Sequence, residues 1–175
     1  MTHSLVFTAI GKNRTGIVSE ITKLATDFGC NIVDSRMAIL GSEFTLIMLL
    51  NGKKSSINQI ETRLPILAYS LELLTISKRS TTTTNEIVNE YVHINLIGTD
   101  TPGILKTVTE FFAKRKVDLS SLKSITDNKT NTVETELLIN LTHQVNKQEL
   151  HQDLQKLCDK LSVKLSFTSH QQESK

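Results

Sequence analysis

The chain of 175 residues contains a long internal repeat, and this repeat limits the folds it can adopt. Residues 5–34 align with residues 92–121 without a gap. In both segments, alternating apolar residues precede a turn with two glycines and then apolar residues at helical spacing. The identical pairs are Ile10/Ile97, Gly11/Gly98, Gly16/Gly103, Ile17/Ile104 and Thr22/Thr109. Self-similarity of this length indicates a duplicated folding unit, so we expect two domains of one fold.

Each copy begins with a strand pattern followed by a helix pattern. Leu5, Phe7 and Ala9 alternate with other residues, and the equivalent positions of the second copy do the same. This period of two is typical of a strand with one buried face. The apolar stripes that start at Ile17 and Ile104 recur at i+1, i+4, i+7 and i+8, which predicts an amphipathic helix in each copy.

The rest of each copy predicts two strands joined by a turn, a second helix and a closing strand. In the first copy the strands are expected at 31–40 and 44–50, and Pro65 is expected to end the second helix. In the second copy the turn is longer, at 127–131. The order βαββαβ is the ferredoxin-like arrangement, an antiparallel sheet with both helices on one face.

We therefore predict an α+β fold with two ferredoxin-like modules in tandem. The predicted boundaries are 1–79 for the first module, 80–90 for a polar linker, 91–169 for the second module and 170–175 for a polar tail. The outward-facing residues of the first strand differ between the copies, because Val6 is replaced by His93.

The composition limits the classes of protein to which the chain can belong. A chain that is 38% hydrophobic and 22% charged is in the globular range. The sequence has neither the roughly 20 apolar residues that a membrane span needs nor a signal-like start, so we expect a soluble cytoplasmic protein. A net charge of +2 and a pI near 8.5 argue against direct nucleic-acid binding. Cys30 and Cys158 are expected to be free thiols.

The loop between the first strand and the first helix is the strongest candidate for chemistry. Residues 11–18 and 98–105 each leave a strand and open a helix, where free N–H groups and the helix dipole favour a small anion. A nucleotide-binding P-loop is excluded, because Ile17-Val18 stands where Lys-Ser/Thr is required. A purely structural role is the alternative, with Asn13 and Asp100 as helix N-caps.

Catalysis and metal binding have little support in the sequence. The histidines show no HxxxH or HExxH spacing, and no G-x-S-x-G motif is present. Glu134 and Glu136 alternate along a predicted strand, so we expect them on a solvated face. We predict no catalytic residues, no metal site and no cofactor, and the protein is not expected to be an enzyme.

The loop pattern G-x-[DN]-x-x-G-[IV]-[VL] at 11–18 and 98–105, the helix after it and Gly29-Cys30-Asn31-Ile32 resemble ACT domains, the small-molecule-binding modules of amino-acid metabolism. The resemblance covers nearly the whole chain, twice. More narrowly, residues 29–50 look like the glycine cleavage system transcriptional repressor family. This resemblance implies a regulator that responds to glycine and represses by contacting a LysR-type activator, without a DNA-binding element of its own.

The resemblance also implies where the ligand lies. In amino-acid-binding ACT modules the ligand is held between two neighbouring modules, by the first loop of one and the start of the second strand. Asn13 and Asn31 match the polar ligand-contacting positions, and backbone N–H groups follow Asn13 in the loop. The implied site residues are Asn13, Thr15, Gly16, Ile17, Asn31 and Ile32.

The second copy departs from this pattern. Its equivalent positions are Asp100, Pro102, Gly103, Ile104 and Asp118. The two acids that replace Asn13 and Asn31 could hold an ammonium but would repel a carboxylate. We therefore expect the first loop to be the sensing site.

Two other functions are open at this point. ACT modules often accompany a catalytic domain, so the chain could be the regulatory part of an enzyme of amino-acid or one-carbon metabolism. A ferredoxin-like sheet can also bind nucleic acid through stacked aromatics, although aromatic content is only 5% here. Exposed sheet edges are compatible with a homo-oligomer or a protein partner.

Overall fold

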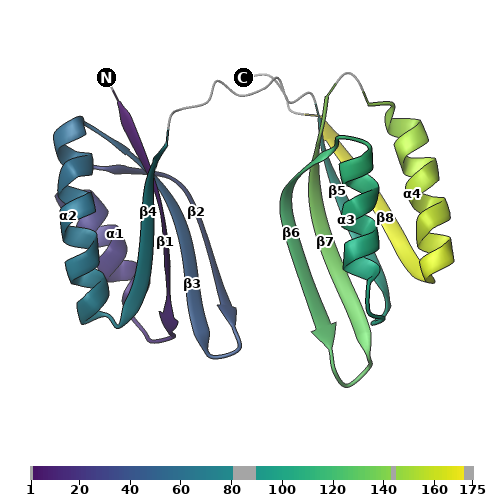
Figure 1. Ribbon diagram of the computed structural model, residues 1–175, viewed down its shortest axis with the longest axis horizontal. Coiled ribbons are helices and arrows are strands. Elements are labelled where there is room, and N and C mark those ends of the chain that lie inside the picture. Colours follow the sequence, from purple (N-terminus) through teal and green to yellow (C-terminus); the bar gives the residue numbers. More distant parts are fainter. Residues whose placement is uncertain (1, 81–89, 143–144, 172–175) are drawn as a thin grey trace. The chain divides into compact units, whose positions relative to one another are not determined.

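The computed structural model describes residues 2–80, 90–142 and 145–171. The chain divides into two compact units, Met1–Thr84 and Asn85–Lys175. Each unit has the order βαββαβ, and Figure 1 shows both helices of each unit on one face of its sheet. The predicted tandem of ferredoxin-like modules is therefore confirmed.

The first module contains two helices and one four-stranded sheet. Its elements are β1 (His3–Lys12), α1 (Ile17–Asp27), β2 (Asn31–Leu40), β3 (Glu43–Gly52), α2 (Lys54–Ser70) and β4 (Leu73–Ser80). The strand order is β2-β3-β1-β4, and all neighbours are antiparallel. This order leaves β2 and β4 as the edges of the sheet.

The second module repeats this topology. Its elements are β5 (Glu90–Thr99), α3 (Ile104–Lys114), β6 (Asp118–Asp127), β7 (Thr132–Leu141), α4 (Lys147–Leu161) and β8 (Val163–Gln171). The strand order is β6-β7-β5-β8, again antiparallel throughout. Both β2 and β6 have a register shift near their starts, between Ile32 and Asp34 and between Leu119 and Ser121.

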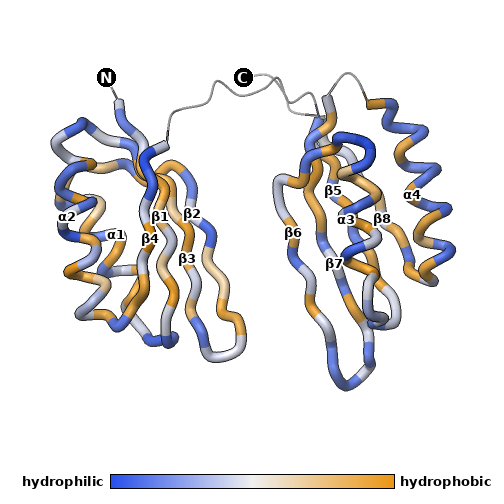
Figure 2. Tube along the Cα trace, in the orientation of Figure 1, coloured by the Kyte–Doolittle hydropathy of each residue, from blue (hydrophilic) through white to orange (hydrophobic). Residues whose placement is uncertain are grey.

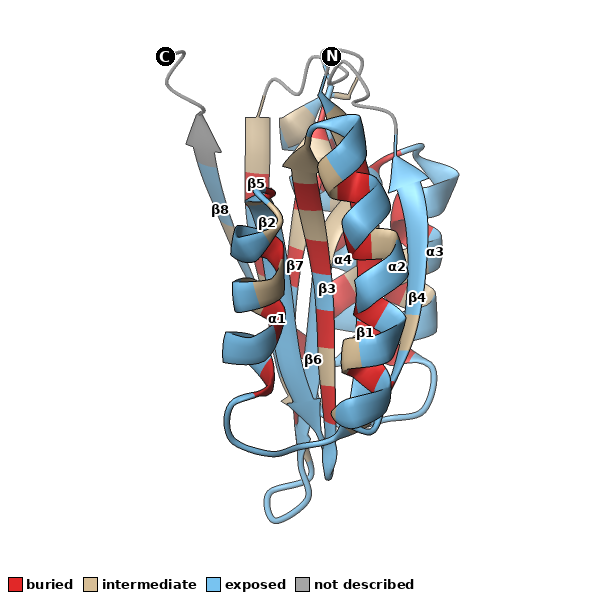
Figure 3. Cartoon of the chain, turned by 90° about the vertical axis from the view of Figure 1, so that its left-hand side faces the viewer, coloured by how far each residue is buried: buried red, intermediate tan, exposed pale blue. Residues whose placement is uncertain are grey.

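Each module has its own core between the helices and the covered face of the sheet. In the first module Phe7 on β1, Met48 on β3 and Ile21 on α1 are all at most 2% exposed. Figure 3 shows buried positions alternating along β3, and Figure 2 colours long stretches of β1 and β3 as hydrophobic. Each such side chain contributes about 1.5–3 kcal/mol when buried, so packing of these stripes holds the helices in place.

Within each module the described helices cover one face of the sheet, and we call the other face the open face (Figure 1). In the first module it carries Val6, Ile10 and Ile47, whereas in the second module it carries His93, Asn95 and the exposed Glu134. Successive residues of a strand point to opposite faces, so the register assigns these positions directly. The open faces of the two modules therefore differ in chemistry.

The prediction that Pro65 ends the second helix is wrong. Helix α2 continues through Pro65 to Ser70, and the apolar stripe of Ile57, Ile60 and Leu64 goes on to the buried Ala68. Pro65 itself is exposed, so its ring lies on the solvent side of the helix. Burial of the residues beyond it outweighs the lost hydrogen bond to the carbonyl of Glu61.

The predicted linker and tail are slightly too long. Ser80 is the last residue of β4 and pairs with Ser4, while Glu90 begins β5 and forms an ion pair with Lys147. Strand β8 runs to Gln171 and so includes two residues of the predicted tail. Residues 81–89 and 172–175 lie outside the described residues. Among the described residues, no helix is long and apolar enough to cross a membrane.

Replacement of Pro65 tests the account of α2. Pro65→Ala restores an amide donor at an exposed helix position, and we expect it to raise the free energy of unfolding by about 1–3 kcal/mol. The measurement is urea unfolding of the whole chain followed by circular dichroism. Ile66→Ala, at the adjacent exposed position, is the control and should change stability by no more than about 0.5 kcal/mol. A less stable Pro65→Ala protein would contradict the account.

Candidate functional site

The β1–α1 loop of the first module and the β5–α3 loop of the second enter their helices in the same way. Gly16 and Gly103 are the N-cap residues, each with φ of 96°. This left-handed conformation suits glycine, because a side chain there is strained. The alternative that Asn13 and Asp100 cap the helices is wrong, since neither helix has a side-chain cap.

Backbone hydrogen bonds fix both loops against the neighbouring hairpin. The Asn13 N–H donates to Ser42 O at 3.1 Å, and the Asp100 N–H donates to Asn131 O at 2.8 Å. In the first loop, Arg14 Nη2 also donates to Ser70 O at 3.0 Å, at the C-terminal end of α2. A cation is favourable at that end of a helix dipole. Each loop therefore lies at the hairpin end of its sheet.

The two loops differ in which polar groups are satisfied. In the second module, Thr126 Oγ1 donates to Asp100 Oδ2 at 3.2 Å, and the Ile104 N–H donates to Thr101 O at 3.3 Å. In the first module Ile39 occupies the position of Thr126, and its side chain has no hydroxyl to donate to Asn13. Within the described residues, the Asn13 side chain and the Ile17 N–H have no hydrogen-bond partner. The second loop therefore has two internal hydrogen bonds that the first loop lacks.

The implied site residues fall into two groups at opposite ends of the first sheet. Asn13 follows Lys12, which pairs with Glu43 at the hairpin end, whereas Asn31 pairs with Asn51 at the other end. Strand β2 has ten residues, so the two ends are roughly 30 Å apart at ~3.3 Å per residue. One amino acid cannot touch Asn13 and Asn31 of the same module.

The side chains of the implied residues differ in access. Those of Asn13, Thr15 and Asn31 are exposed, and so are Asp100, Pro102 and Asp118 in the second module. Ile17 and Ile104 are buried, and Ile32 packs against the core. Ile17 and Ile104 can therefore present only backbone atoms to a ligand, whereas the side chain of Ile32 is partly exposed.

The row of the first open face that contains Asn31 is polar across its central strands. The register places Asn31, Asn51 and Ser4 side by side on β2, β3 and β1. The sequence did not single out Asn51 or Ser4. Ser4 is 5% exposed, and the Asn51 Oδ1 atom is buried without a hydrogen-bond partner.

A cavity of about 320 Å³ adjoins this polar row on the open face. Val6, Ile47 and Leu49 form its apolar floor, and Asp34 and Arg36 stand on its β2 side. Arg36 Nη2 lies 3.6 Å from Asp34 Oδ2. The cavity thus combines apolar surface with one charge of each sign.

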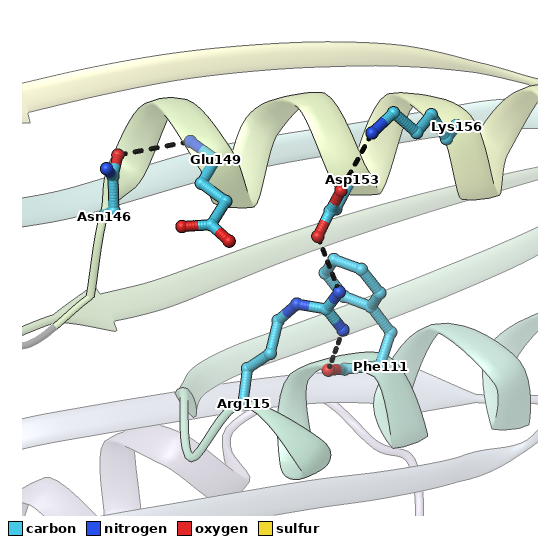
Figure 4. A network of polar contacts seen from close by, with 6 residues as sticks. All are labelled: Phe111, Arg115, Asn146, Glu149, Asp153 and Lys156. Carbon is cyan, nitrogen blue, oxygen red and sulfur yellow. Dashed lines mark hydrogen bonds and ion pairs between the residues drawn. The ribbon is translucent and has the colours of Figure 1, made fainter.

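A second polar cluster lies between α3 and α4 and is structural. The Arg115 guanidinium lies 3.8 Å from the centre of the Phe111 ring and donates to Asp153 Oδ2 at 2.9 Å (Figure 4). Lys156 also bonds Asp153, and these two donors, Arg115 first, hold the pKa of that carboxyl below its usual range. The cluster joins the two helices through satisfied charges.

Neither cysteine has the environment of a reactive nucleophile. Cys30 and Cys158 are buried free thiols. Burial, followed by the nearby Asp159, raises the pKa of the Cys158 thiol to about 11, and burial raises the pKa of Cys30. A thiol is a poor nucleophile at neutral pH under these conditions. Residues 2–80, 90–142 and 145–171 contain no cluster able to hold a metal ion.

Two βαββαβ modules, each with a glycine loop before its first helix, define the class of protein, a tandem ACT-domain protein. The family model of the ACT domain matches residues 3–77. The chain is 34% identical to the glycine cleavage system transcriptional repressor of Escherichia coli over 94% of its own length and 89% of the relative. It therefore belongs to the glycine cleavage system transcriptional repressor family.

Solved structures agree with this assignment. A crystal structure of a candidate glycine cleavage system transcriptional repressor is 34% identical, with a TM-score of 0.77 over 98% of this chain and 99% of that one. An unknown protein from Galdieria sulphuraria has the same fold at 21% identity, with a TM-score of 0.74 over 97% of this chain and 99% of that one. Family membership supports a regulatory role, and the ACT fold implies binding of a small amino acid.

Proposed function

We propose that this protein is an amino-acid-responsive repressor that senses its ligand at the β1–α1 loop of the first module. The observation that carries the proposal is the unpartnered amide of Asn13 beside the free N–H of Ile17. A ligand carboxylate accepts from N–H groups at the start of α1, where the helix dipole also favours a negative charge. The Asn13 amide offers both a donor and an acceptor to the rest of the ligand.

The second loop is proposed not to bind this ligand. Thr126 already occupies one carboxylate oxygen of Asp100, and Thr101 O already accepts the N–H of Ile104. An amino acid would have to displace these bonds and bring its carboxylate near Asp100. Both effects oppose binding, so a single sensing loop per chain is expected.

The other half of the ligand site is proposed to come from a second chain. Strand β2 is an edge strand of ten residues, and Val33, Met37, Ile39 and Leu40 on it are 49–66% exposed. Two such edges can add to each other as antiparallel strands. A two-fold pairing of this kind brings the start of β2 in one chain, with Asn31, toward the Asn13 end of β2 in the other.

The output is proposed to be contact with a protein partner. We propose a LysR-type activator as that partner and glycine as the ligand, because the family resemblance implies both. The modest net charge of +2 does not favour direct binding to duplex DNA, whose affinity depends on neutralised phosphates. The open face of the first module, with Val6, Ile10 and Ile47, is proposed as the contact surface.

Calorimetric titration tests the sensing loop. We expect the chain to bind one member of a panel of glycine, alanine, serine, leucine and phenylalanine. Asn13→Ala should weaken that binding about tenfold or more, because it removes hydrogen bonds to a charged ligand. Asp100→Ala, at the equivalent position, is the matched control and should bind as wild type. Equal affinity of wild type and Asn13→Ala would remove Asn13 from the site.

Sedimentation tests the β2 edge. A lysine on an edge strand opposes strand pairing, so Met37→Lys should convert a dimer to a monomer and weaken ligand binding with it. Leu74→Lys places the same charge on the other edge, at a residue that is 76% exposed, and should leave the dimer intact. A Met37→Lys protein that remains dimeric would show that the chains associate elsewhere.

A further inference from the structure

The most unusual polar group of the first module is the side chain of Asn51 on β3. Its Oδ1 atom is buried and has no hydrogen-bond partner, and the side chain makes no other hydrogen bond among the described residues. A buried amide oxygen without a donor lowers the stability of the folded chain. Asn51 pairs directly with Asn31 in the antiparallel register, so the two side chains stand on the same face about 5 Å apart.

The second module shows what normally satisfies this position. Asn140 on β7 pairs with Asp118 as Asn51 pairs with Asn31. Ser120, the residue at the register shift of β6, donates its hydroxyl to Asn140 Oδ1 at 2.5 Å. At the same register shift of β2 the first module has Val33, which cannot donate. Asn140 Oδ1 therefore has a hydrogen-bond donor in the second module, whereas Asn51 Oδ1 has none in the first.

We propose that Asn51 is a ligand-binding residue and that its Oδ1 accepts a hydrogen bond from the ammonium group of the amino acid. This inference rests on the proposed function, because it completes the half-site to which Asn31 belongs. An ammonium has three N–H donors and no acceptor, so it suits two neighbouring amide oxygens, one from the exposed Asn31 side chain and one from the buried Oδ1 of Asn51. The adjoining cavity above Val6 and Leu49 gives a ligand room to approach the polar row.

Asn95 has the other buried and unpartnered side-chain oxygen within the described part of the chain. Its situation differs, because its Nδ2 atom donates to Glu134 Oε1 at 2.9 Å and so fixes the amide. The first module has Thr8 at that position. The unsatisfied oxygen of Asn95 follows from its bond to a charged neighbour, whereas Asn51 has no internal bond that sets its orientation.

Two substitutions in the whole chain test this role by calorimetry, with the panel amino acid that wild type binds most tightly. Asn51→Leu removes the acceptor and should weaken binding about 10- to 100-fold, the range for a hydrogen bond to a charged group. Val33→Ser introduces the hydroxyl that Ser120 provides in the second module. This hydroxyl should donate to Asn51 Oδ1 and so weaken ligand binding. Urea unfolding should show that the variant is at least as stable as wild type. Neither change leaves a buried group unpaired, and far-UV circular dichroism checks the fold.

The controls are the equivalent changes in the second module and a ligand without an ammonium. Asn140→Leu and Ser120→Val should bind the amino acid within about twofold of wild type. N-acetylglycine has no ammonium, so its weak binding should be the same for wild type and Asn51→Leu.

The outcomes separate this inference from the proposed function. If Asn51→Leu and Val33→Ser bind as wild type while Asn13→Ala does not, Asn51 is no ligand residue and the sensing loop stands. If wild type binds no amino acid of the panel, the proposed function falls and this inference falls with it. If Asn51→Leu weakens N-acetylglycine as strongly as the free amino acid, the acceptor does not act on the ammonium.

Discussion

The burial of two helices against one face of each four-stranded sheet is the constraint on which the rest of the structure depends. Residues such as Phe7, Met48 and Ile21 can be removed from water only if α1 and α2 lie on the same side of the sheet. That packing leaves three places for recognition, which are the loop ends, the edge strands and the open face. The candidate site uses the first two and borders the third.

The duplication lets one module serve as an internal reference for the other. Ser120 and Thr126 on β6 each donate a hydroxyl to a polar side chain of the second module. Val33 and Ile39 occupy the same positions of β2 and have no hydroxyl. Asn51 Oδ1 is therefore buried without a partner, and the exposed Asn13 side chain has no partner among the described residues. An unsatisfied buried acceptor lowers stability, and a ligand that binds only the folded state can restore it. The two modules therefore have one fold but differ in which polar side chains have a hydrogen-bond partner within the protein.

Much of the fold follows from local patterns in the sequence. The ungapped repeat, the period-two strands and the helical stripes predict both modules, and the structure confirms them. Pro65 was misjudged because tertiary burial of Ala68 overrides the local preference of proline. The alternative that Asn13 caps α1 fails because the chain path requires a left-handed residue at the cap and so selects Gly16.

The site is less predictable than the fold, because it depends on register. Sequence resemblance points to Asn13 and Asn31, but only the strand pairing places them at opposite ends of one sheet. Asn51 has no local signal at all. It could be found only after the strand pairing aligns Asn51 with Asn140, because the longer hairpin of the second module shifts this equivalence away from the ungapped repeat.

The central claim is that the first module is open to an amino acid and the second is closed. Hydrogen–deuterium exchange of the whole chain, with and without a saturating amino acid, tests it directly. The account predicts ligand-induced protection in residues 13–18 and 31–34, and unchanged exchange in residues 100–105 and 118–121. Equal protection in both sets, or protection confined to the second module, would contradict it.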